Sequence, residues 1–318
     1  MAKKILVGGI QSTGRPHIGN YFGAMKQFVD LQNEYDARIF VADMHSFTTA
    51  ESEWKNIGDY SIGVILDYLA IGLDLDKVLL YRQSDAPRVA ELCWYFNCIT
   101  TMPYLMRSHA YKDAEAKKKE ISLGTFSYPM LMAADILIHD ADVVPVGRDQ
   151  KQHIECARDT AEKFNRIFGE TFKLPSEFTP EEVAIVPGLD GEKMSKSKKN
   201  TIPLFASDEE IEAAVKKIVT DSNGGIPQNV YNIHKLLRDE RYLQKLYQEN
   251  EGKYKNLKDA LIEDLKTFIR PLREKRAEFE KRLPEILEIV AENGKKADVL
   301  MAEKMIEVKR AMGLMQTH

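Results

Sequence analysis

The sequence predicts an α/β protein in which a doubly wound parallel sheet is followed by an all-helical C-terminal domain. Short apolar runs alternate with amphipathic segments as far as residue 200, and a glycine-rich turn joins the first run to the first helical segment. From residue 201 to 318, helical periodicity continues with almost no strand signal. Alternation of this kind is typical of parallel sheets with right-handed crossovers. We therefore expect one domain over residues 1–200 and a second over 201–318.

The expected strands are short and rich in branched apolar residues, and they lie at 5–8, 38–43, 78–81, 142–146 and 184–186. The expected helices carry apolar residues at three- and four-residue spacing, and they lie at 18–35, 56–73, 89–99, 128–137 and 150–168. Beyond residue 200, Ser207 and Glu210 have the spacing of a capping box at a helix start. The first region is thus expected to be Rossmann-like, with ligands bound at the carboxyl ends of its strands.

Composition excludes several classes of protein. Apolar residues make up 44% and charged residues 30% of the 318 residues, which predicts a large core and not disorder. The net charge of −4 argues against a protein that coats nucleic acid, so any RNA contact should be local. Cys93, Cys98 and Cys156 form no C-x-x-C pair, so we expect buried thiols and no protein-bound metal. The apolar runs are too short for a signal peptide or a membrane span, which predicts a cytoplasmic location.

The turn between the first strand and the first helix runs from Gly8 to Asn20 and is rich in glycine and small polar residues. Glycines let a backbone approach a ligand closely, and a helix N-terminus supplies free N–H groups to an anion. The turn is neither a Walker A loop nor a G-x-G-x-x-G loop. It predicts a phosphate site, although glycine turns before helices are also common structural devices.

A second polar loop carries two lysines three residues apart, Lys193 and Lys196, between Gly191 and the small hydroxyl residues Ser195 and Ser197. Such a loop predicts a mobile cationic clamp for phosphates. A simple solvated surface loop is the alternative.

One carboxylate lies within an apolar helical segment. Tyr128, Met132 and Asp135 share one helical face because they are four and three residues apart. A carboxylate on such a face is costly unless a partner satisfies it. The alternatives are a structural salt bridge or cap, and acceptance of a hydrogen bond from a ligand donor.

These segments resemble the signatures of class I aminoacyl-tRNA synthetases, in particular the tryptophanyl family. His17-Ile18-Gly19-Asn20 resembles the HIGH signature with the asparagine variant of that family, and residues 193–197 match the KMSKS signature in full. Residues 132–137 and 143–153 are similar to two further tryptophanyl motifs. The motifs extend from Gly9 to Ser197, and the ending at 311–314 also matches.

The resemblance implies an enzyme that activates L-tryptophan with ATP and Mg²⁺ and transfers it to tRNA(Trp). It further implies a homodimer, an anticodon-binding helical region at 201–318, and a last helix that packs back on the catalytic domain. The residues implied in catalysis are Lys193, Lys196, His17 and Asn20. Those implied in binding ATP are Gln11, Ser12, Thr13, Gly19, Asn20, Gly147, Arg148, Asp149, Val186, Lys193, Met194, Ser195, Lys196 and Ser197. Those implied in binding tryptophan are Asp135, Met132, Tyr128, Gln150 and His45, the histidine at the substrate amino group.

The chain departs from the family pattern at three positions. Ser12 stands where the family usually has proline, Arg148 replaces a common acid, and Ala114 replaces a lysine that contacts phosphates in some relatives. Two other functions remain open at this level. A tyrosyl enzyme on the same scaffold would also use an aspartate, and a noncatalytic paralogue would bind a ligand or RNA without chemistry.

Overall fold

The computed structural model describes residues 2–49, 51–116, 120–147, 151–178, 186–220 and 225–315. A five-stranded, fully parallel sheet lies at its centre, in the order β3-β2-β1-β4-β5. The strands are β1 (Ile5–Ile10), β2 (Asp36–Val41), β3 (Val78–Arg82), β4 (Val143–Pro145) and β5 (Ser176–Phe178). The predicted fold class, α/β with a doubly wound parallel sheet, is confirmed.

Four of the strands lie where the apolar runs predicted them, and the fifth does not. β5 was missed because Ser176–Phe178 contains a single apolar residue; its pairing with β4 is what makes it a strand. Of the strand predicted at 184–186, the first two residues lie outside the described part of the chain. Val186 lies beyond the named strands, where its carbonyl oxygen accepts a hydrogen bond from the Met194 amide at 3.0 Å.

Helices cover both faces of the sheet. In the first region these are α1 (Ile18–Asn20), α2 (Lys26–Leu31), α3 (Asp43–Ser46), α4 (Ile57–Ala70), α5 (Arg88–Ile99), α6 (Met102–Leu105), α7 (His109–Ala116), α8 (Leu123–Leu137) and α9 (Lys151–Phe168). Short helical segments of other types are η1 (Tyr21–Met25, a π-helix), η2 (Glu51–Asn56), η3 (Gln83–Asp85) and η5 (Lys196–Lys198). The predicted helix at 18–35 is therefore three short segments, α1, η1 and α2, one of them a π-turn of the kind often found at functional sites.

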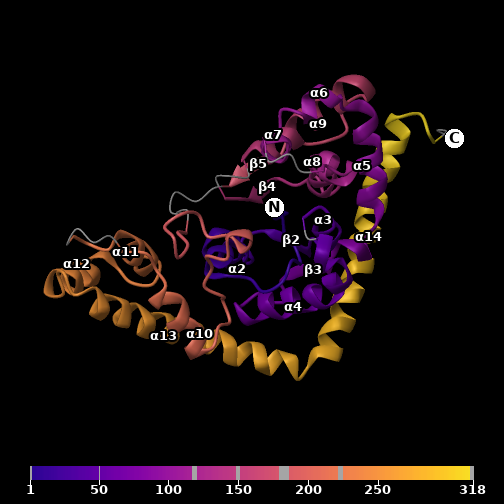
Figure 1. Ribbon diagram of the computed structural model, residues 1–318. Helices are drawn as coiled ribbons and strands as arrows, with labels where there is room; N and C mark the ends of the chain where they lie inside the picture. The colour runs from indigo at the N-terminus through magenta and orange to yellow at the C-terminus, as the bar shows by residue number, and fades with distance from the viewer. Residues whose placement is uncertain are drawn as a thin grey trace.

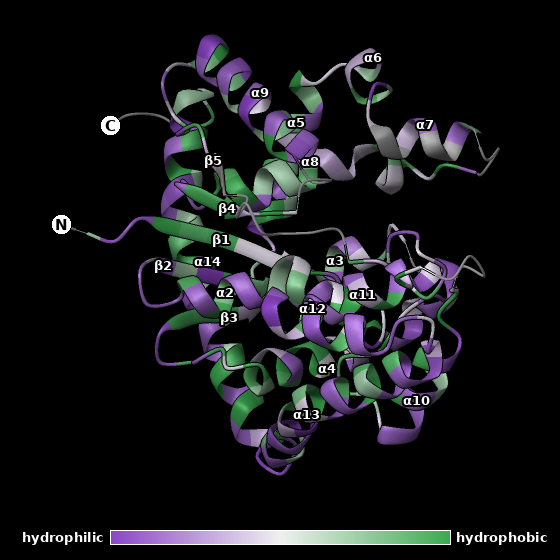
Figure 2. Ribbon diagram, turned by 90° about the vertical axis from the view of Figure 1, so that its left-hand side faces the viewer, coloured by the Kyte–Doolittle hydropathy of each residue, from purple (hydrophilic) through white to green (hydrophobic). Residues whose placement is uncertain are grey.

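Alternate residues of the central strands enter two different hydrophobic clusters. Leu6 and Ile39 belong to one cluster, whereas Val7 and Phe40 belong to the other. Side chains of a strand point to opposite faces in turn, so both faces of this sheet are buried. In Figure 2 the central strands are largely hydrophobic, whereas the helices around them alternate hydrophilic and hydrophobic residues along their length.

The C-terminal part consists of helices α10 (Asp208–Lys216), α11 (Gln228–His234), α12 (Glu240–Glu249), α13 (Tyr254–Glu280) and α14 (Leu283–Ala311). The predicted capping box is present, since the Ser207 side chain accepts from the Glu210 amide and Glu210 accepts from the Ser207 amide. In Figure 1, α11 and α12 lie at the far end of α13, and α14 runs back along the sheet, where it contacts β3 and α5. In the described part of the chain, no helix is long and apolar enough to cross a membrane. Ile202 and Leu204 follow the predicted domain boundary at residue 200, yet they share a core cluster with Leu6 of β1. The boundary therefore stays a prediction.

The close approach of α14 to η3 depends on a glycine. A Cβ atom built on Gly294 would lie 2.5 Å from the Cβ of Asp85, well inside van der Waals contact. We expect Gly294→Ala to lower the free energy of unfolding by about 1–3 kcal/mol, the usual cost of overpacking. Urea unfolding measures it.

The matched control is Gly58→Ala in α4, where an added Cβ meets nothing within 4 Å. That change should stabilise the protein by about 0.5–1 kcal/mol, since alanine loses less backbone entropy in a helix. Equal stability of the two variants would show that α14 and η3 are not closely packed at Gly294.

Candidate active site

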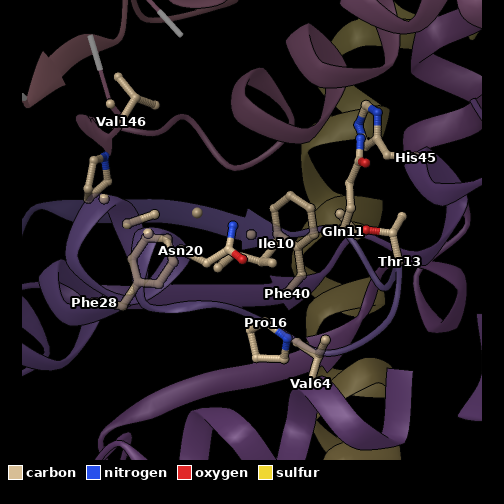
Figure 3. Close-up of a pocket in the computed structure, with 18 of the residues that line it drawn as sticks. Ile10, Gln11, Thr13, Pro16, Asn20, Phe28, Phe40, His45, Val64 and Val146 are labelled. Carbon is tan, nitrogen blue, oxygen red and sulfur yellow. The ribbon is translucent and has the colours of Figure 1, made fainter. Parts of the chain in front are cut away.

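A cavity of about 640 Å³ lies at the carboxyl ends of the central strands. Its walls come from the end of β1, the glycine-rich turn, η1, α8, the end of β4 and the segment at 193–196. In Figure 3, His45, Gln11 and Thr13 lie at one end of this pocket, Val146 lies at the other, and Ile10 and Phe40 lie between them. The size and position match those of small-molecule sites in open α/β sheets.

The fold brings most of the predicted site residues to this one cavity. Those that line it are Gln11, Thr13, His17, Gly19, Asn20, His45, Tyr128, Met132, Asp135, Gly147, Val186, Lys193, Met194, Ser195 and Lys196. Ser12 lies behind the wall, fully buried, with its Oγ 3.1 Å from Ser46 Oγ, so its side chain does not reach a ligand from this position. Ser197 is also outside the lining, with its Oγ 3.0 Å from Ser195 Oγ. Arg148, Asp149 and Gln150 lie outside the described residues.

His17 and Asn20 cap the helix that begins in the first signature. The Asn20 amide donates to His17 Nδ1 at 3.2 Å, and the His17 amide donates to Asn20 Oδ1 at 3.0 Å. Burial, assisted by the charges of Lys196 and Lys193, lowers the pKa of His17 to about 4. The imidazole is therefore neutral at pH 7, and because Nδ1 accepts, its proton is on Nε2. His17 thus offers an uncharged N–H donor to an anion.

Lys196 reaches across to the first signature. Its Nζ donates to the carbonyl oxygens of Thr13 at 3.0 Å and Gly14 at 2.9 Å. Burial lowers the pKa of Lys196 to about 8, although the Asp67 carboxylate opposes the shift. The ammonium group is thus held at the cavity wall by neutral acceptors.

Buried Asn200 shapes the loop that carries both lysines. Asn200 Oδ1 accepts from the Ser195 amide at 2.8 Å, and its Nδ2 donates to Asp190 Oδ1 at 2.7 Å and to the Lys193 carbonyl at 3.2 Å. These bonds hold the two ends of the loop together. Sequence reasoning did not find Asn200, because no periodicity or motif distinguishes it.

Backbone contacts tie the two signatures together. The Ile18 amide donates to the Ile202 carbonyl at 3.0 Å, and the Leu204 amide donates to the Pro16 carbonyl, also at 3.0 Å. Gly19 allows the approach, since a Cβ there would lie 3.3 Å from the Cβ of Met194 and 2.8 Å from His17 Nδ1. The cations of one signature are therefore fixed beside the helix start of the other.

Asp135 lies on α8 and faces the cavity although it is 3% exposed. Its Oδ2 accepts from His45 Nε2 at 2.8 Å, and Gln83 Nε2 donates to Oδ1 at 2.8 Å and Oδ2 at 3.0 Å. Burial raises the pKa of the Asp135 carboxyl, while the bonds from His45 and Gln83 oppose the shift. Because His45 Nε2 is occupied by Asp135, only Nδ1 of that ring remains to accept from a ligand amino group.

Apolar side chains complete the cavity around this carboxylate. Met132 and Tyr128 of α8 lie on the same wall as predicted, and the Tyr128 hydroxyl lies 2.6 Å from His153 Nε2. Residues that sequence reasoning did not single out also contribute, and they are Ile10, Phe28, Phe40, Val144 and Val146. The sequence offered one indication of their role: these residues lie in or near the ends of predicted strands, in the first helix, or in one of the motifs described above.

Comparisons with known proteins fit this geometry. Residues 2–288 match the family described as class I tRNA synthetases (W and Y). The chain is 43% identical to the tryptophan–tRNA ligase of Fusobacterium nucleatum and 41% identical to that of Rhodopirellula baltica; the matches cover 97% of this chain in both cases, and 97% and 99% of those proteins. The chain belongs to the tryptophanyl-tRNA synthetase family.

A solved structure of a tryptophanyl-tRNA synthetase has the same fold. The Campylobacter jejuni enzyme, crystallised with ADP and tryptophan, superimposes with a TM-score of 0.86 at 39% identity, and the match covers 97% of this chain and 99% of that one. Near-complete coverage at this identity favours the tryptophanyl over the tyrosyl alternative.

Proposed function

We propose that this synthetase forms tryptophanyl-adenylate from ATP and L-tryptophan and transfers the tryptophanyl group to the 2′-hydroxyl of the terminal adenosine of tRNA(Trp). One observation carries the proposal. A single cavity joins a buried carboxylate, Asp135, to the cationic end formed by Lys193 and Lys196. One end of the cavity thus suits an apolar ligand with a single N–H donor, and the other suits a triphosphate.

The cationic end supports adenylate formation. The tryptophan carboxylate attacks the α-phosphorus of ATP, the bond from that phosphorus to the bridging oxygen breaks, and pyrophosphate leaves. Lys193 and Lys196 stabilise the charge that develops on the phosphate oxygens, and neutral His17 donates from Nε2. Asn20 holds His17 in this orientation. The reaction needs no nucleophile from the protein, so Ser195 serves as a hydrogen-bond donor.

Asp135 supports selection of tryptophan. Indole has one N–H donor and no acceptor, whereas phenylalanine has no ring donor. A buried carboxylate rejects phenylalanine because that ligand would leave it without its partner. Met132 and Val144 line the same cavity and supply apolar surface for the indole ring of tryptophan. The Nδ1 atom of His45 accepts from the substrate amino group.

Several features of the enzyme belong to the proposal. Mg²⁺ enters with ATP and is held by its phosphates, which is how this ion usually binds in such sites. Among the described residues, no three His, Cys, Asp or Glu side chains are grouped to hold a metal. The catalytic domain at 1–200, the anticodon-binding region at 201–318, the homodimer and the cytoplasmic location remain predictions.

Exchange of labelled pyrophosphate into ATP tests the function, with each of the twenty amino acids supplied in turn. Tryptophan should support exchange, because its indole N–H supplies a donor for Asp135 that phenylalanine lacks. Exchange that depends on tyrosine would overturn the assignment in favour of the tyrosyl alternative. Binding of tryptophan without exchange would identify a noncatalytic paralogue.

A further inference from the structure

Gln83 has no assigned role, yet Gln83 and His45 both donate hydrogen bonds to the Asp135 carboxylate of the pocket. It is 1% exposed and lies in η3, directly after β3. Its Nε2 donates to both oxygens of Asp135, at 2.8 Å and 3.0 Å. Gln83 does not line the cavity, so it touches the ligand site only through Asp135.

The arrangement leaves one defined acceptor position on Asp135. An ionised carboxylate offers about four lone-pair sites and donates nothing. Within the described part of the chain, Oδ2 accepts from His45 and Gln83, whereas Oδ1 accepts from Gln83 alone. A lone pair of Oδ1 therefore remains for a donor from the cavity, and its direction is set by the plane in which Gln83 holds the carboxylate.

The Gln83 amide is oriented by this carboxylate. Its Oε1 is buried and has no hydrogen-bond partner among the described residues. A flipped amide would place that oxygen against the carboxylate oxygens, which is repulsive. The –NH₂ group is therefore the end that faces Asp135.

The backbone of Gln83 is fixed on both sides. The Ser84 amide donates to Asp43 Oδ1 at 3.0 Å, and the Ser84 hydroxyl donates to Oδ2 of the same buried residue. Arg82 forms a two-point ion pair with Asp85, with both N···O distances 2.9 Å. A side chain anchored in this way keeps one geometry, as a positioning residue requires.

We propose that Gln83 is a positioning residue that sets tryptophan specificity by holding the Asp135 carboxylate with one oxygen lone pair directed at the indole N–H. The inference rests on the proposed function and deepens it. Without Gln83, the carboxylate loses two of its three hydrogen bonds and can turn about its side-chain bonds. The preference for a ligand with a ring N–H should then fall, whereas ATP is bound by other residues.

The test compares tryptophan with an analogue in which sulfur replaces the indole N–H, 3-(1-benzothiophen-3-yl)alanine. Pyrophosphate exchange gives kcat and KM for each substrate with wild type and Gln83→Met, a variant of similar size without a donor. Wild type should prefer tryptophan by about tenfold or more, as expected for a hydrogen bond to a charged group. Gln83→Met should lower this preference by about fivefold or more, mainly through KM for tryptophan, with KM for ATP unchanged.

The matched control is Gln32→Met. Gln32 is also buried, and its Nε2 donates to the Val29 and Gly72 carbonyls, away from the cavity. This variant should lose stability and keep the wild-type preference between the two substrates. If Gln83→Met does not fold, Gln83→Leu replaces it; leucine also has no donor for Asp135, so the preference should again fall by about fivefold or more.

Two failures are distinguishable. Wild type that supports no tryptophan-dependent exchange, or that uses both substrates equally, would overturn the proposed function or the role of Asp135. A wild-type enzyme that prefers tryptophan, together with Gln83 variants that keep the same preference, would overturn only the inference about Gln83.

Discussion

Lys196→Ala is expected to slow tryptophanyl-adenylate formation by about 10²–10³-fold, the usual effect of removing one group that stabilises transition-state charge. Tryptophan affinity should change little. In the free enzyme, the ammonium group donates to the Thr13 and Gly14 carbonyls, and Lys196 lines the cavity proposed to hold the triphosphate. Its charge is needed chiefly as the phosphate geometry changes, so the loss should appear in kcat. Single-turnover formation of adenylate and equilibrium binding of tryptophan measure the two effects separately.

Lys198→Ala is the matched control in the same loop. Lys198 does not line the cavity, and its exposed ammonium lies 3.7 Å from Glu192. This variant should form adenylate at nearly the wild-type rate. Equal losses of adenylate formation and tryptophan binding in Lys196→Ala would contradict a role for Lys196 in the chemical step.

The pH dependence gives a second measurement of the same charge. Burial lowers the pKa of Lys196 to about 8. The side chain is therefore positively charged below that pH and loses its charge as the pH rises through it. The kcat/KM for ATP reports groups of the free enzyme, so it should fall above pH 8. Lys196→Arg keeps its charge throughout this range, and its profile should be flat there even if its activity is lower. An identical fall in both proteins would assign the pH effect to another group.

Asp135→Ala is expected to lower kcat/KM for tryptophan by about 10–150-fold, since a hydrogen bond to a charged group contributes about 1.5–3 kcal/mol. Discrimination against phenylalanine should disappear, because the buried group that phenylalanine leaves unpaired is gone. The donors of His45 and Gln83 also lose their acceptor, which adds a loss of stability. Competition between tryptophan and phenylalanine in pyrophosphate exchange measures the discrimination.

Asp264→Ala controls for the loss of a buried aspartate. Asp264 lies on α13, accepts from His234 Nε2 at 2.8 Å and pairs with Arg238, outside the cavity. Its removal should destabilise the protein and leave the choice of amino acid unchanged. If Asp135→Ala still discriminates tryptophan from phenylalanine, Asp135 does not contact the indole ring.

Much of the fold and of the candidate site was predictable from local pattern. Short apolar runs located four strands, because burial of both faces of the sheet makes nearly every strand residue apolar. Helical spacing located most helices, because one face of each helix is buried. The two signatures and the acid of α8 were recognisable because each is a contiguous run of residues. Their position at strand ends followed from the parallel sheet, where carboxyl ends meet at one edge.

The sequence by itself therefore determined the α/β architecture, the two signatures and the apolar helix face that bears Asp135. Only the tertiary structure decided that Gln83 donates to Asp135, 52 residues away in the sequence, and that Lys196 donates to the Thr13 carbonyl, 183 residues away. It also decided that Ser12 is buried outside the lining of the cavity. The physical reason is that periodicity records which side of an element is buried. The partner met there depends on strand order, register and close approaches such as that of Gly294 to Asp85, and these are properties of the packed chain.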